Sequence, residues 1–248
     1  MPKRVCRAYS LAALMEEVEK HDIISFDIFD TLVMRNVYYN KDVFRLMALQ
    51  LDPVWGLDFF SIRTEAEQVL SRETYPYIEE IYDYISERYP CLKGKEAELI
   101  ALEIQMETDL ILPRQDVVDV FNLAKKLQKR VYIVSDMYMH QADLEKIIND
   151  LGIVGYDKIF VSCEYDTSKP QRLFECYKKE ITASSYLHIG DSYMCDIEPS
   201  AKLGIDSFRL CMSTEIWEGA GNKPAENLDE RLVQAKYIAE NVNSPFSA

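Results

Sequence analysis

The most constraining feature of this chain is a run of apolar residues, Ile23 to Phe29, that is interrupted only by Ser25 and Asp27. Continuous apolar character with β-branched and aromatic residues is typical of a strand that is buried on both faces of a sheet. An ionised carboxylate avoids such a place unless it is paired, hydrogen-bonded or bound to a metal. Asp27 is therefore either a reactive or metal-binding carboxylate or a strand-end residue that caps a turn.

Strands and helices alternate through the second half of the chain. Apolar runs predict strands at residues 131–135, 158–162, 186–190 and 206–210. Periodic apolar patterns predict helices at residues 115–128, 141–151, 169–180 and 195–203. This alternation predicts an α/β fold with a parallel sheet and right-handed crossovers. Ligands of such sheets bind beyond the carboxyl ends of the strands.

Residues with chemically useful side chains lie at or just after three of these predicted strands. They are Ser135-Asp136, then Ser168-Lys169-Pro170, and then Gly190-Asp191 with Asp196 five residues further on. Ser168 is a suitable N-cap and Pro170 is tolerated in the first turn, so Lys169 is expected at the start of a helix.

In this order, the three segments and the FDIFDTL stretch resemble the four motifs of the haloacid dehalogenase-like (HAD) superfamily. The resemblance covers about residues 20–215. It implies a Rossmann-like parallel sheet, the HAD core, with an inserted α-helical cap domain. It also implies that Asp27 is a nucleophile that forms an aspartyl intermediate, a route that splits one difficult step into two. Ser135 then hydrogen-bonds the transferring group, and Lys169 steadies the nucleophile and the negative charge.

The resemblance further implies a Mg²⁺ site. The ligands would be Asp27, the backbone carbonyl of Phe29 and Asp191, with Asp196 in support. Mg²⁺ prefers hard oxygen ligands and keeps several waters, so this set suffices. The ion offsets the repulsion between an anionic nucleophile and an anionic phosphate.

The expected substrate contacts are Thr31, Arg35, Ser135, Asp136 and Lys169. Asp136 would either orient the Ser135 hydroxyl or cap the next helix. Arg35 would either contact a phosphate or carboxylate of the substrate or be a solvated surface arginine.

The first motif departs from the family pattern at Phe29. Most HAD phosphatases have a second Asp there, which protonates the leaving group, and Asp30 occupies a position where the family usually has Gly. Phenylalanine cannot transfer a proton, whereas 2-haloacid dehalogenases have an aromatic residue at this position. Three functions stay open. The first is a Mg²⁺-dependent phosphohydrolase or phosphotransferase whose acid is Asp30, His140 or a cap residue, or is not needed. The others are a 2-haloacid dehalogenase and a non-catalytic module that binds phosphate and Mg²⁺.

Helical patterns replace the βα alternation between residues 40 and 112. Four amphipathic stripes occur there, the last of which is Leu99, Leu102, Met106 and Leu110. We therefore expect a cap at residues 36–112 and a core domain at residues 1–35 and 113–248, with further helices near residues 11–18 and 225–243. Within the cap, Arg63 is expected to pair with Glu67 at i+4 or to face the site. His188 lies inside a strand and is expected to be a satisfied core histidine.

The composition restricts the partners. The chain has 248 residues and a net charge of −14, which argues against nucleic acid and anionic membranes, because both bind basic surfaces. A small phosphorylated molecule is the expected substrate. The six cysteines are scattered and form no zinc spacing, which is typical of the reducing cytoplasm. No signal peptide or membrane span is evident, and nothing in the sequence predicts an oligomeric state.

Overall fold

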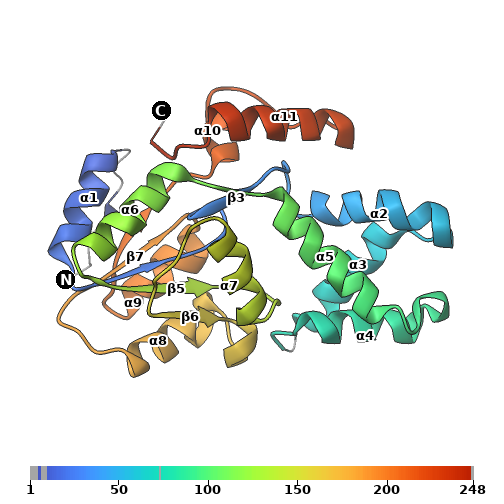
Figure 1. The fold of residues 1–248 in the computed structure, drawn as a ribbon, viewed down its shortest axis with the longest axis horizontal. Helices are drawn as coiled ribbons and strands as arrows, with labels where there is room; N and C mark the ends of the chain where they lie inside the picture. The colour runs from blue at the N-terminus through green and yellow to red at the C-terminus, as the bar shows by residue number, and fades with distance from the viewer. Residues whose placement is uncertain (1–4, 7–9, 73, 247–248) are drawn as a thin grey trace.

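A parallel sheet of six strands forms the centre of the molecule (Figure 1). The structure is a computed structural model that describes residues 5–6, 10–72 and 74–246. In the order β1-β8-β7-β2-β5-β6, the strands are β1 (Val5–Cys6), β8 (Asp206–Arg209), β7 (Tyr186–Gly190), β2 (Ile23–Phe26), β5 (Arg130–Ser135) and β6 (Lys158–Val161). Every pair of neighbours is parallel. The predicted α/β fold class is therefore confirmed.

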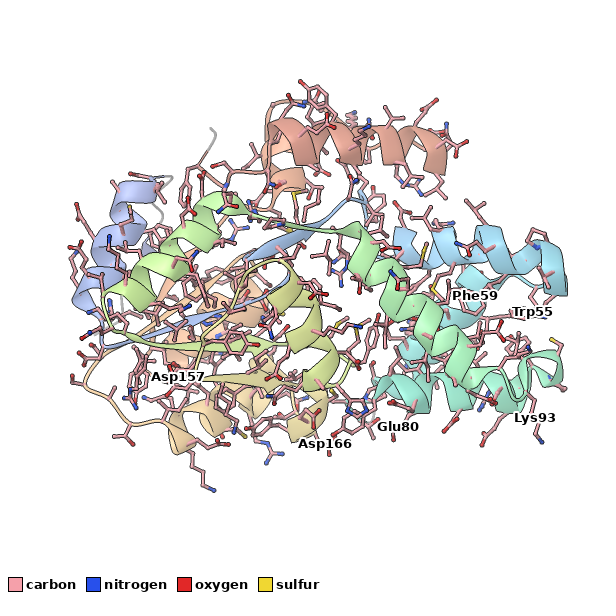
Figure 2. All side chains as sticks on the ribbon, in the orientation of Figure 1. Trp55, Phe59, Glu80, Lys93, Asp157 and Asp166 are labelled. Carbon is pink, nitrogen blue, oxygen red and sulfur yellow. The ribbon has the colours of Figure 1, made fainter. Side chains whose placement is uncertain are left out.

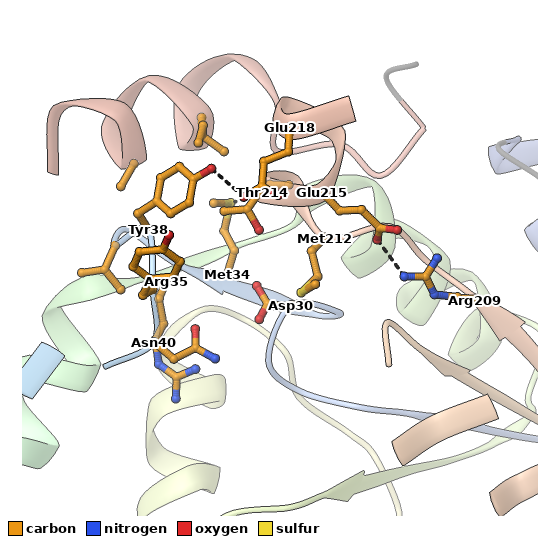
Figure 3. Close-up of a pocket in the computed structure, with 15 residues that line it drawn as sticks. Asp30, Met34, Arg35, Tyr38, Asn40, Arg209, Met212, Thr214, Glu215 and Glu218 are labelled. Atoms are coloured by element: carbon orange, nitrogen blue, oxygen red, sulfur yellow. Dashed lines mark hydrogen bonds and ion pairs between the residues drawn. The ribbon is translucent and has the colours of Figure 1, made fainter. Parts of the chain in front are cut away.

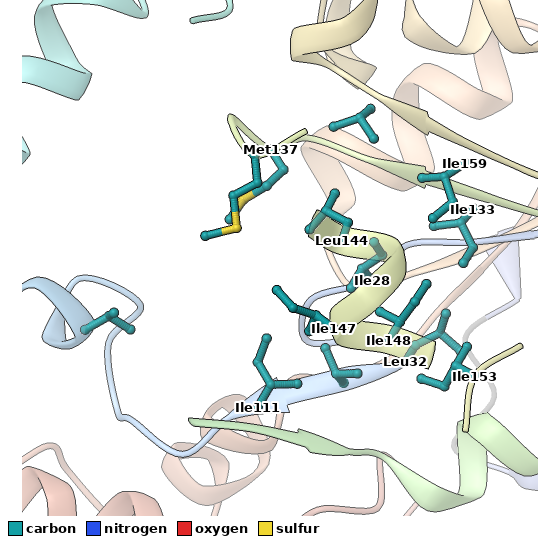
Figure 4. Packing of buried hydrophobic residues seen from close by; sticks show 14 of the residues in the cluster. Ile28, Leu32, Ile111, Ile133, Met137, Leu144, Ile147, Ile148, Ile153 and Ile159 are labelled. Atoms are coloured by element: carbon teal, nitrogen blue, oxygen red, sulfur yellow. The ribbon is translucent and has the colours of Figure 1, made fainter. Parts of the chain in front are cut away.

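Helices cover both faces of this sheet because the strand side chains alternate between two apolar clusters. Phe26 and Ile133 belong to one cluster, whereas Ile23 and Tyr132 belong to the other. The first face carries α1 (Leu11–Lys20), α6 (Gln115–Lys126) and α7 (Gln141–Asp150). The second carries α8 (Phe174–Glu180). Figure 4 shows Leu144, Ile147 and Ile148 of α7 beside Ile133 and Ile159 of the sheet.

The helices predicted at 169–180 and 195–203 are each interrupted near their start. Lys169–Leu173 and Tyr193–Ile197 form π-helical turns, which lead into α8 and α9 (Glu198–Lys202). Such turns are often found at functional sites. Here the first turn begins at Lys169, and the second follows the loop that carries Asp191.

The segment between residues 36 and 112 is helical. It contains α2 (Asp42–Trp55), α3 (Phe59–Leu70), α4 (Ile78–Arg88), a short 3₁₀ turn (Pro90–Leu92) and α5 (Glu96–Leu110). Its two connections to the sheet pair with each other as an antiparallel ribbon, β3 (Val33–Arg35) and β4 (Ile111–Pro113). Figure 1 shows the four long helices grouped together, beyond β3 and to one side of the sheet. We keep the division at residues 36 and 112 as a proposal.

The apolar stripe that we predicted for α5 is not its most buried face. Leu99 is buried, but the residues that share its buried face are Glu103 and Glu107. Leu102, Met106 and Leu110 are only partly buried. The prediction was wrong because a periodicity argument assigns carboxylates to solvent, whereas both of these pair with arginines from other elements.

Two helices follow the sheet at the C-terminal end, α10 (Ser213–Gly219) and α11 (Leu228–Asn241). Only α11 was predicted. Arg231 of α11 binds Asp42 at the start of the helical segment through two hydrogen bonds of 2.7 and 2.9 Å. Tyr38 donates to Glu218 of α10 at 2.8 Å. Among the described residues, no helix is both long enough and apolar enough to cross a membrane.

Candidate active site

Three carboxylates meet beyond the carboxyl ends of β2 and β7. Asp27 directly follows β2, Asp191 directly follows β7, and Asp196 lies in the π-helical turn that comes next. One oxygen from each lies within 4.8 Å of the others. All three side chains are largely buried, at 6%, 9% and 0% exposure respectively. The structure thus brings together the three carboxylates predicted as metal ligands, as expected where strand ends share one edge of a sheet.

Lys169 lies within this carboxylate cluster. Its Nζ donates to Asp27 Oδ1 at 2.8 Å and to Asp196 Oδ1 at 2.5 Å, and the side chain is 4% exposed. The backbone N–H of Lys169 donates to Asp136 Oδ1 at 2.9 Å, so Asp136 fixes the start of the π-helical turn. Burial alone lowers the pKa of Lys169, but Asp196 and Asp27 raise it well above its ordinary value. The ammonium therefore stays charged.

Gly190 is needed for Asp196 to reach this place. A Cβ added to Gly190 would lie 2.3 Å from Cγ of Asp196, a separation that no side chain tolerates. Asp196 also accepts hydrogen bonds from the backbone N–H of Ser192 at 2.9 Å and from His188 Nε2 at 3.2 Å. The glycine in the GDxxxxD pattern is thus explained by close packing at the strand end.

The carboxylate cluster carries more negative charge than Lys169 can balance. Burial raises the pKa of Asp27 well above its ordinary value. Burial and the nearby charge of Asp196 raise the pKa of Asp191 to about 7. Burial also acts to raise the pKa of Asp196, but Lys169 and His188 hold it below its ordinary value. Two of the three carboxylates therefore resist ionisation, which a further cation beside them would relieve.

Two hydroxyls border the carboxylate cluster. Ser135 ends β5, is 1% exposed, and its Oγ has no hydrogen-bond partner among the described residues. A buried hydroxyl without a partner is costly and calls for an explanation such as a ligand. Thr31 Oγ1 donates to Asp191 Oδ1 at 3.5 Å, so in this structure it supports a carboxylate.

Phe29 and Arg35 form a stacked pair beside the carboxylate cluster. The guanidinium carbon of Arg35 lies 3.9 Å from the centroid of the Phe29 ring. Arg35 Nε donates to Glu107 of α5 at 2.7 Å, and the arginine is buried. The alternative of a solvated surface arginine is therefore wrong.

Asp30 adopts a left-handed backbone conformation, with φ of 55°, which glycine adopts more readily than other residues. Its backbone carbonyl accepts a hydrogen bond from Arg114 Nη1. Arg114 also donates to the carbonyls of Cys211 and Asn243, at 2.8 and 3.0 Å, and is fully buried. Our sequence analysis missed Arg114, because an arginine that binds only carbonyls leaves no charge pattern.

Two cavities flank β3. One, of about 350 Å³, lies between the sheet and the helical segment, and Phe29, Arg35, Asp136 and Tyr138 are among its lining residues. The other, of about 500 Å³, lies between β3 and the C-terminal helices (Figure 3). Figure 3 shows the Asp30 carboxylate turned into this second cavity, between Met34 and Met212.

His140 lies at the junction between the helical segment and the sheet domain. Its Nε2 lies 3.1 Å from Glu79 of α4, and its Nδ1 lies 3.3 Å from Glu164 of the sheet domain. The Tyr77 ring stacks on it at 4.6 Å. Nearby, the backbone N–H of Tyr75 contacts Asp166 at 3.4 Å, and Figure 2 labels Asp166 on the sheet side of this junction. His140 thus joins two parts of the molecule.

Comparisons with known proteins were made by sequence and by structure. A family model described as haloacid dehalogenase-like hydrolase matches residues 21–204. No curated protein that was searched matches the chain. The chain is similar to L-2-haloacid dehalogenase from Xanthobacter autotrophicus, at 13% identity and a TM-score of 0.55, over 90% of this chain and 89% of that one.

Two further solved structures are similar. One is 2-haloacid dehalogenase from Pseudomonas syringae pv. Tomato DC3000, at 13% identity and a TM-score of 0.54, covering 89% of this chain and 98% of that one. The other is a HAD phosphatase from Thermococcus onnurineus, at 14% identity and a TM-score of 0.51, covering 88% and 97%. At these identities the likeness shows the fold alone, and both activities occur among these neighbours.

Proposed function

Because the chain belongs to the haloacid dehalogenase-like hydrolases, we propose that it is a Mg²⁺-dependent phosphohydrolase or phosphotransferase. Its substrate would be a small phosphorylated metabolite, and Asp27 would form the aspartyl intermediate. The observation that carries this proposal is the cluster of Asp27, Asp191 and Asp196, which share a single ammonium, that of Lys169. We also propose a cytoplasmic location, which fits the scattered spacing of the six cysteines in the sequence.

The donor set fits Mg²⁺. All the candidate ligands are hard oxygen atoms, and the raised pKa values of Asp27 and Asp191 indicate a need for positive charge between them. Asp27, the carbonyl of Phe29 and Asp191 would hold the ion, with Asp196 behind them. When bound, the ion would offset the charge of the phosphate and of the nucleophile.

Phosphoryl transfer would then proceed in two steps. A carboxylate oxygen of Asp27 bonds to phosphorus while the bond from phosphorus to the leaving oxygen breaks, and the leaving oxygen takes that electron pair. Water then attacks the aspartyl phosphate, which releases inorganic phosphate and restores Asp27; an acceptor alcohol in place of water gives a phosphotransferase. Lys169 orients Asp27 through its hydrogen bond and, together with the bound ion, would favour the ionised carboxylate. The unpartnered hydroxyl of Ser135 would donate to a phosphoryl oxygen.

The surroundings of Phe29 bear on the substrate class. Its ring is stacked under Arg35, so no proton donor occupies the position of the usual acid. Asp30 turns into the second cavity and His140 is bound by Glu79 and Glu164, so neither is well placed as a substitute. A positioned acid contributes about 10²–10⁴-fold. We therefore propose substrates whose leaving group needs no proton, such as acyl phosphates and phosphoanhydrides, with Arg35 and Asp136 lining the cavity that receives them.

The direct test measures phosphate release from acyl, anhydride, aryl and alkyl phosphates, with and without Mg²⁺. We expect Mg²⁺-dependent turnover that Asp27→Asn lowers by at least about 10³-fold without unfolding the protein, because the nucleophile is lost. Asp22→Asn, at the opposite end of β2 and exposed, is the matched control and should keep its activity. Activity of Asp27→Asn near the wild-type level contradicts the mechanism.

The same panel distinguishes the alternatives. Phe29, the aromatic residue at the acid position, is the observation that favours a 2-haloacid dehalogenase. Metal-independent chloride release from 2-chloropropionate would establish dehalogenase activity in place of the proposed phosphoryl transfer. No turnover of any compound would favour a module that binds phosphate and Mg²⁺ without catalysis.

Substituting Phe29→Asp tests the missing acid. If its absence limits the rate, hydrolysis of alkyl phosphates should rise by up to about 10²–10⁴-fold, because alkoxides need a proton to leave. Hydrolysis of acyl phosphates should change little, and it serves as the internal control. A rate for alkyl phosphates that stays the same or falls would mean that the acid lies elsewhere or is not required.

A further inference from the structure

His188 lies in the middle of β7, and its side chain is completely buried. Its Nε2 lies 3.2 Å from Asp196 Oδ1, and its Nδ1 lies 2.9 Å from Ser25 Oγ of the neighbouring strand β2. The edge of the Phe174 ring packs against the imidazole, with 4.7 Å between the centroids. The prediction of a satisfied core histidine holds for its hydrogen bonds, but one partner belongs to the carboxylate cluster.

The partners of His188 define its tautomer. Asp196 accepts from the Lys169 ammonium at Oδ1 and from the Ser192 N–H at Oδ2, so it acts as an acceptor toward His188 as well. The proton that His188 directs at Asp196 is therefore on Nε2, and Nδ1 lies 2.9 Å from the Ser25 hydroxyl, which also contacts the Leu187 carbonyl at 3.4 Å. Burial lowers the pKa of His188, which keeps the ring neutral. His188 thus gives Asp196 a hydrogen bond without adding a second positive charge to the site.

Asp196 links His188 to the proposed nucleophile. Oδ1 of Asp196 receives both His188 Nε2 and Lys169 Nζ, and Oδ2 receives the backbone N–H of Ser192. Lys169 Nζ in turn contacts Asp27 Oδ1. A continuous chain of hydrogen bonds therefore runs from Ser25 through His188, Asp196 and Lys169 to Asp27.

We propose that His188 is a positioning residue, which fixes the carboxylate of Asp196 and thereby the ammonium of Lys169 against Asp27. This inference rests on the proposed function. Without the Nε2 proton, Asp196 keeps Lys169 and one backbone N–H as its donors. Oδ1 of Asp196 is then held by Lys169 alone, so the carboxylate and the ammonium can shift together relative to the nucleophile. Hydrogen-bond partners of this kind, one step removed from a metal or a nucleophile, typically matter by about 10–100-fold in metal affinity or rate.

The chain offers a matched control in His21. It is also a buried histidine that binds a carboxylate, with Nε2 3.0 Å from Asp206 Oδ2 and Nδ1 2.6 Å from the carbonyl of Glu17. It precedes β2 and therefore lies at the end of the sheet opposite to the site. Losing either imidazole removes a hydrogen bond from a buried histidine to a carboxylate, but the carboxylate bound by His188 is the one that also binds Lys169.

The experiment compares His188→Leu, His188→Gln and His21→Leu with the wild type. It measures kcat and KM for acetyl phosphate, the Mg²⁺ affinity from calorimetry, and the urea midpoint. For His188→Leu we expect kcat and Mg²⁺ affinity to fall by about 10–100-fold, with KM changed by less than about threefold. His188→Gln should recover most of this loss, because its amide N–H can replace Nε2–H. His21→Leu should keep kcat and Mg²⁺ affinity despite a lower urea midpoint.

Two results would overturn the proposal. One is a kcat and Mg²⁺ affinity of His188→Leu close to those of His21→Leu. The other is a glutamine variant no better than the leucine variant, which would make His188 a packing residue.

If His188→Leu does not fold, His188→Gln and Ser25→Ala are compared instead. Ser25→Ala removes the partner of His188 Nδ1 and should lower kcat by less than about tenfold. A larger loss of kcat in Ser25→Ala than in His188→Gln would contradict the proposed chain of contacts. Absent phosphate release by the wild type refutes the proposed function, whereas the Mg²⁺ affinities still decide the role of His188.

Discussion

The helical segment and the sheet domain each contain a buried cluster of charged side chains, and the two clusters differ in their charge balance. In the helical segment, Arg63 donates to both oxygens of Glu103 at 2.7 Å and to Glu67 at 2.8 Å. Tyr82 donates to Glu103 at 2.6 Å. Arg63 and Glu103 are completely buried, yet all three guanidinium nitrogens of Arg63 donate and both oxygens of Glu103 accept. We call these residues the cap cluster.

The carboxylate cluster of the sheet domain has the opposite character. Asp27, Asp191 and Asp196 share Lys169, and the hydroxyl of Ser135 has no partner among the described residues. Buried ion pairs are tolerated when every charge is matched and hydrogen-bonded. Burial and perturbed pKa values therefore do not by themselves mark a functional site. The difference between the clusters shows that unmatched charge is the more useful sign.

Removing one carboxylate from each cluster tests this comparison most strongly. Glu103→Leu should lower the free energy of unfolding by about 3–5 kcal/mol, because it leaves Arg63 with only Glu67. Asp191→Asn should cost less than about 0.5 kcal/mol, or stabilise the protein, because it removes like-charge repulsion. Urea unfolding in a metal-free buffer measures both. Equal losses would remove the distinction between the clusters.

Adding Mg²⁺ should stabilise the protein only when the carboxylate cluster is intact. An ion that binds only the folded protein stabilises it by about 2.7 kcal/mol at a hundredfold excess over Kd. We expect this gain in the wild type and in Glu103→Gln, whose carboxylate cluster is intact. Asp191→Asn should show little of the gain. Thermal unfolding with increasing Mg²⁺ measures it, and an equal response of Asp191→Asn would argue that the ion binds elsewhere.

The smallest change in the free energy of unfolding is expected at His140, where the two regions meet. Burial alone lowers its pKa, but Glu79 and Glu164 raise it above its ordinary value. The stabilisation is therefore fully present below about pH 6.5 and fades as the pH rises through the folded-state pKa. Since His140 is 41% exposed, the effect should lie within about 0.2–1 kcal/mol. Urea midpoints of wild type and His140→Gln at pH 5.5 and 8.5 measure it; a difference that grows with pH contradicts the assignment.

The sheet and the location of the site could be predicted from the sequence because both depend on local patterns. Apolar runs that end in Asp27, Ser135 or Asp191 predict strands, and parallel strands bring their ends to one edge. The i+4 pair of Arg63 and Glu67 was also predictable, and the structure contains it. The roles assigned to these residues stay predictions.

The partners of the buried charged residues could not be predicted, because they come from segments that are distant in the sequence. Glu103 and Glu107 lie 40 and 72 residues from the arginines that they bind. The same holds for His188 and Ser25, which are 163 residues apart and become neighbours only through the β2–β7 pairing. A single sequence contains no local sign of such partners.

The pairing of β3 with β4 has a mechanical consequence. Two separate tethers would let the helical segment shift sideways, tilt or twist, but here both tethers form one hydrogen-bonded strip from Val33–Arg35 to Ile111–Pro113. A helical segment joined in this way would rotate mainly about the β3–β4 strip, which acts as a hinge. Since Arg35 belongs to the strip, such a rotation would leave its stacking on Phe29 in place while α5, which carries its partner Glu107, changes its angle to the sheet.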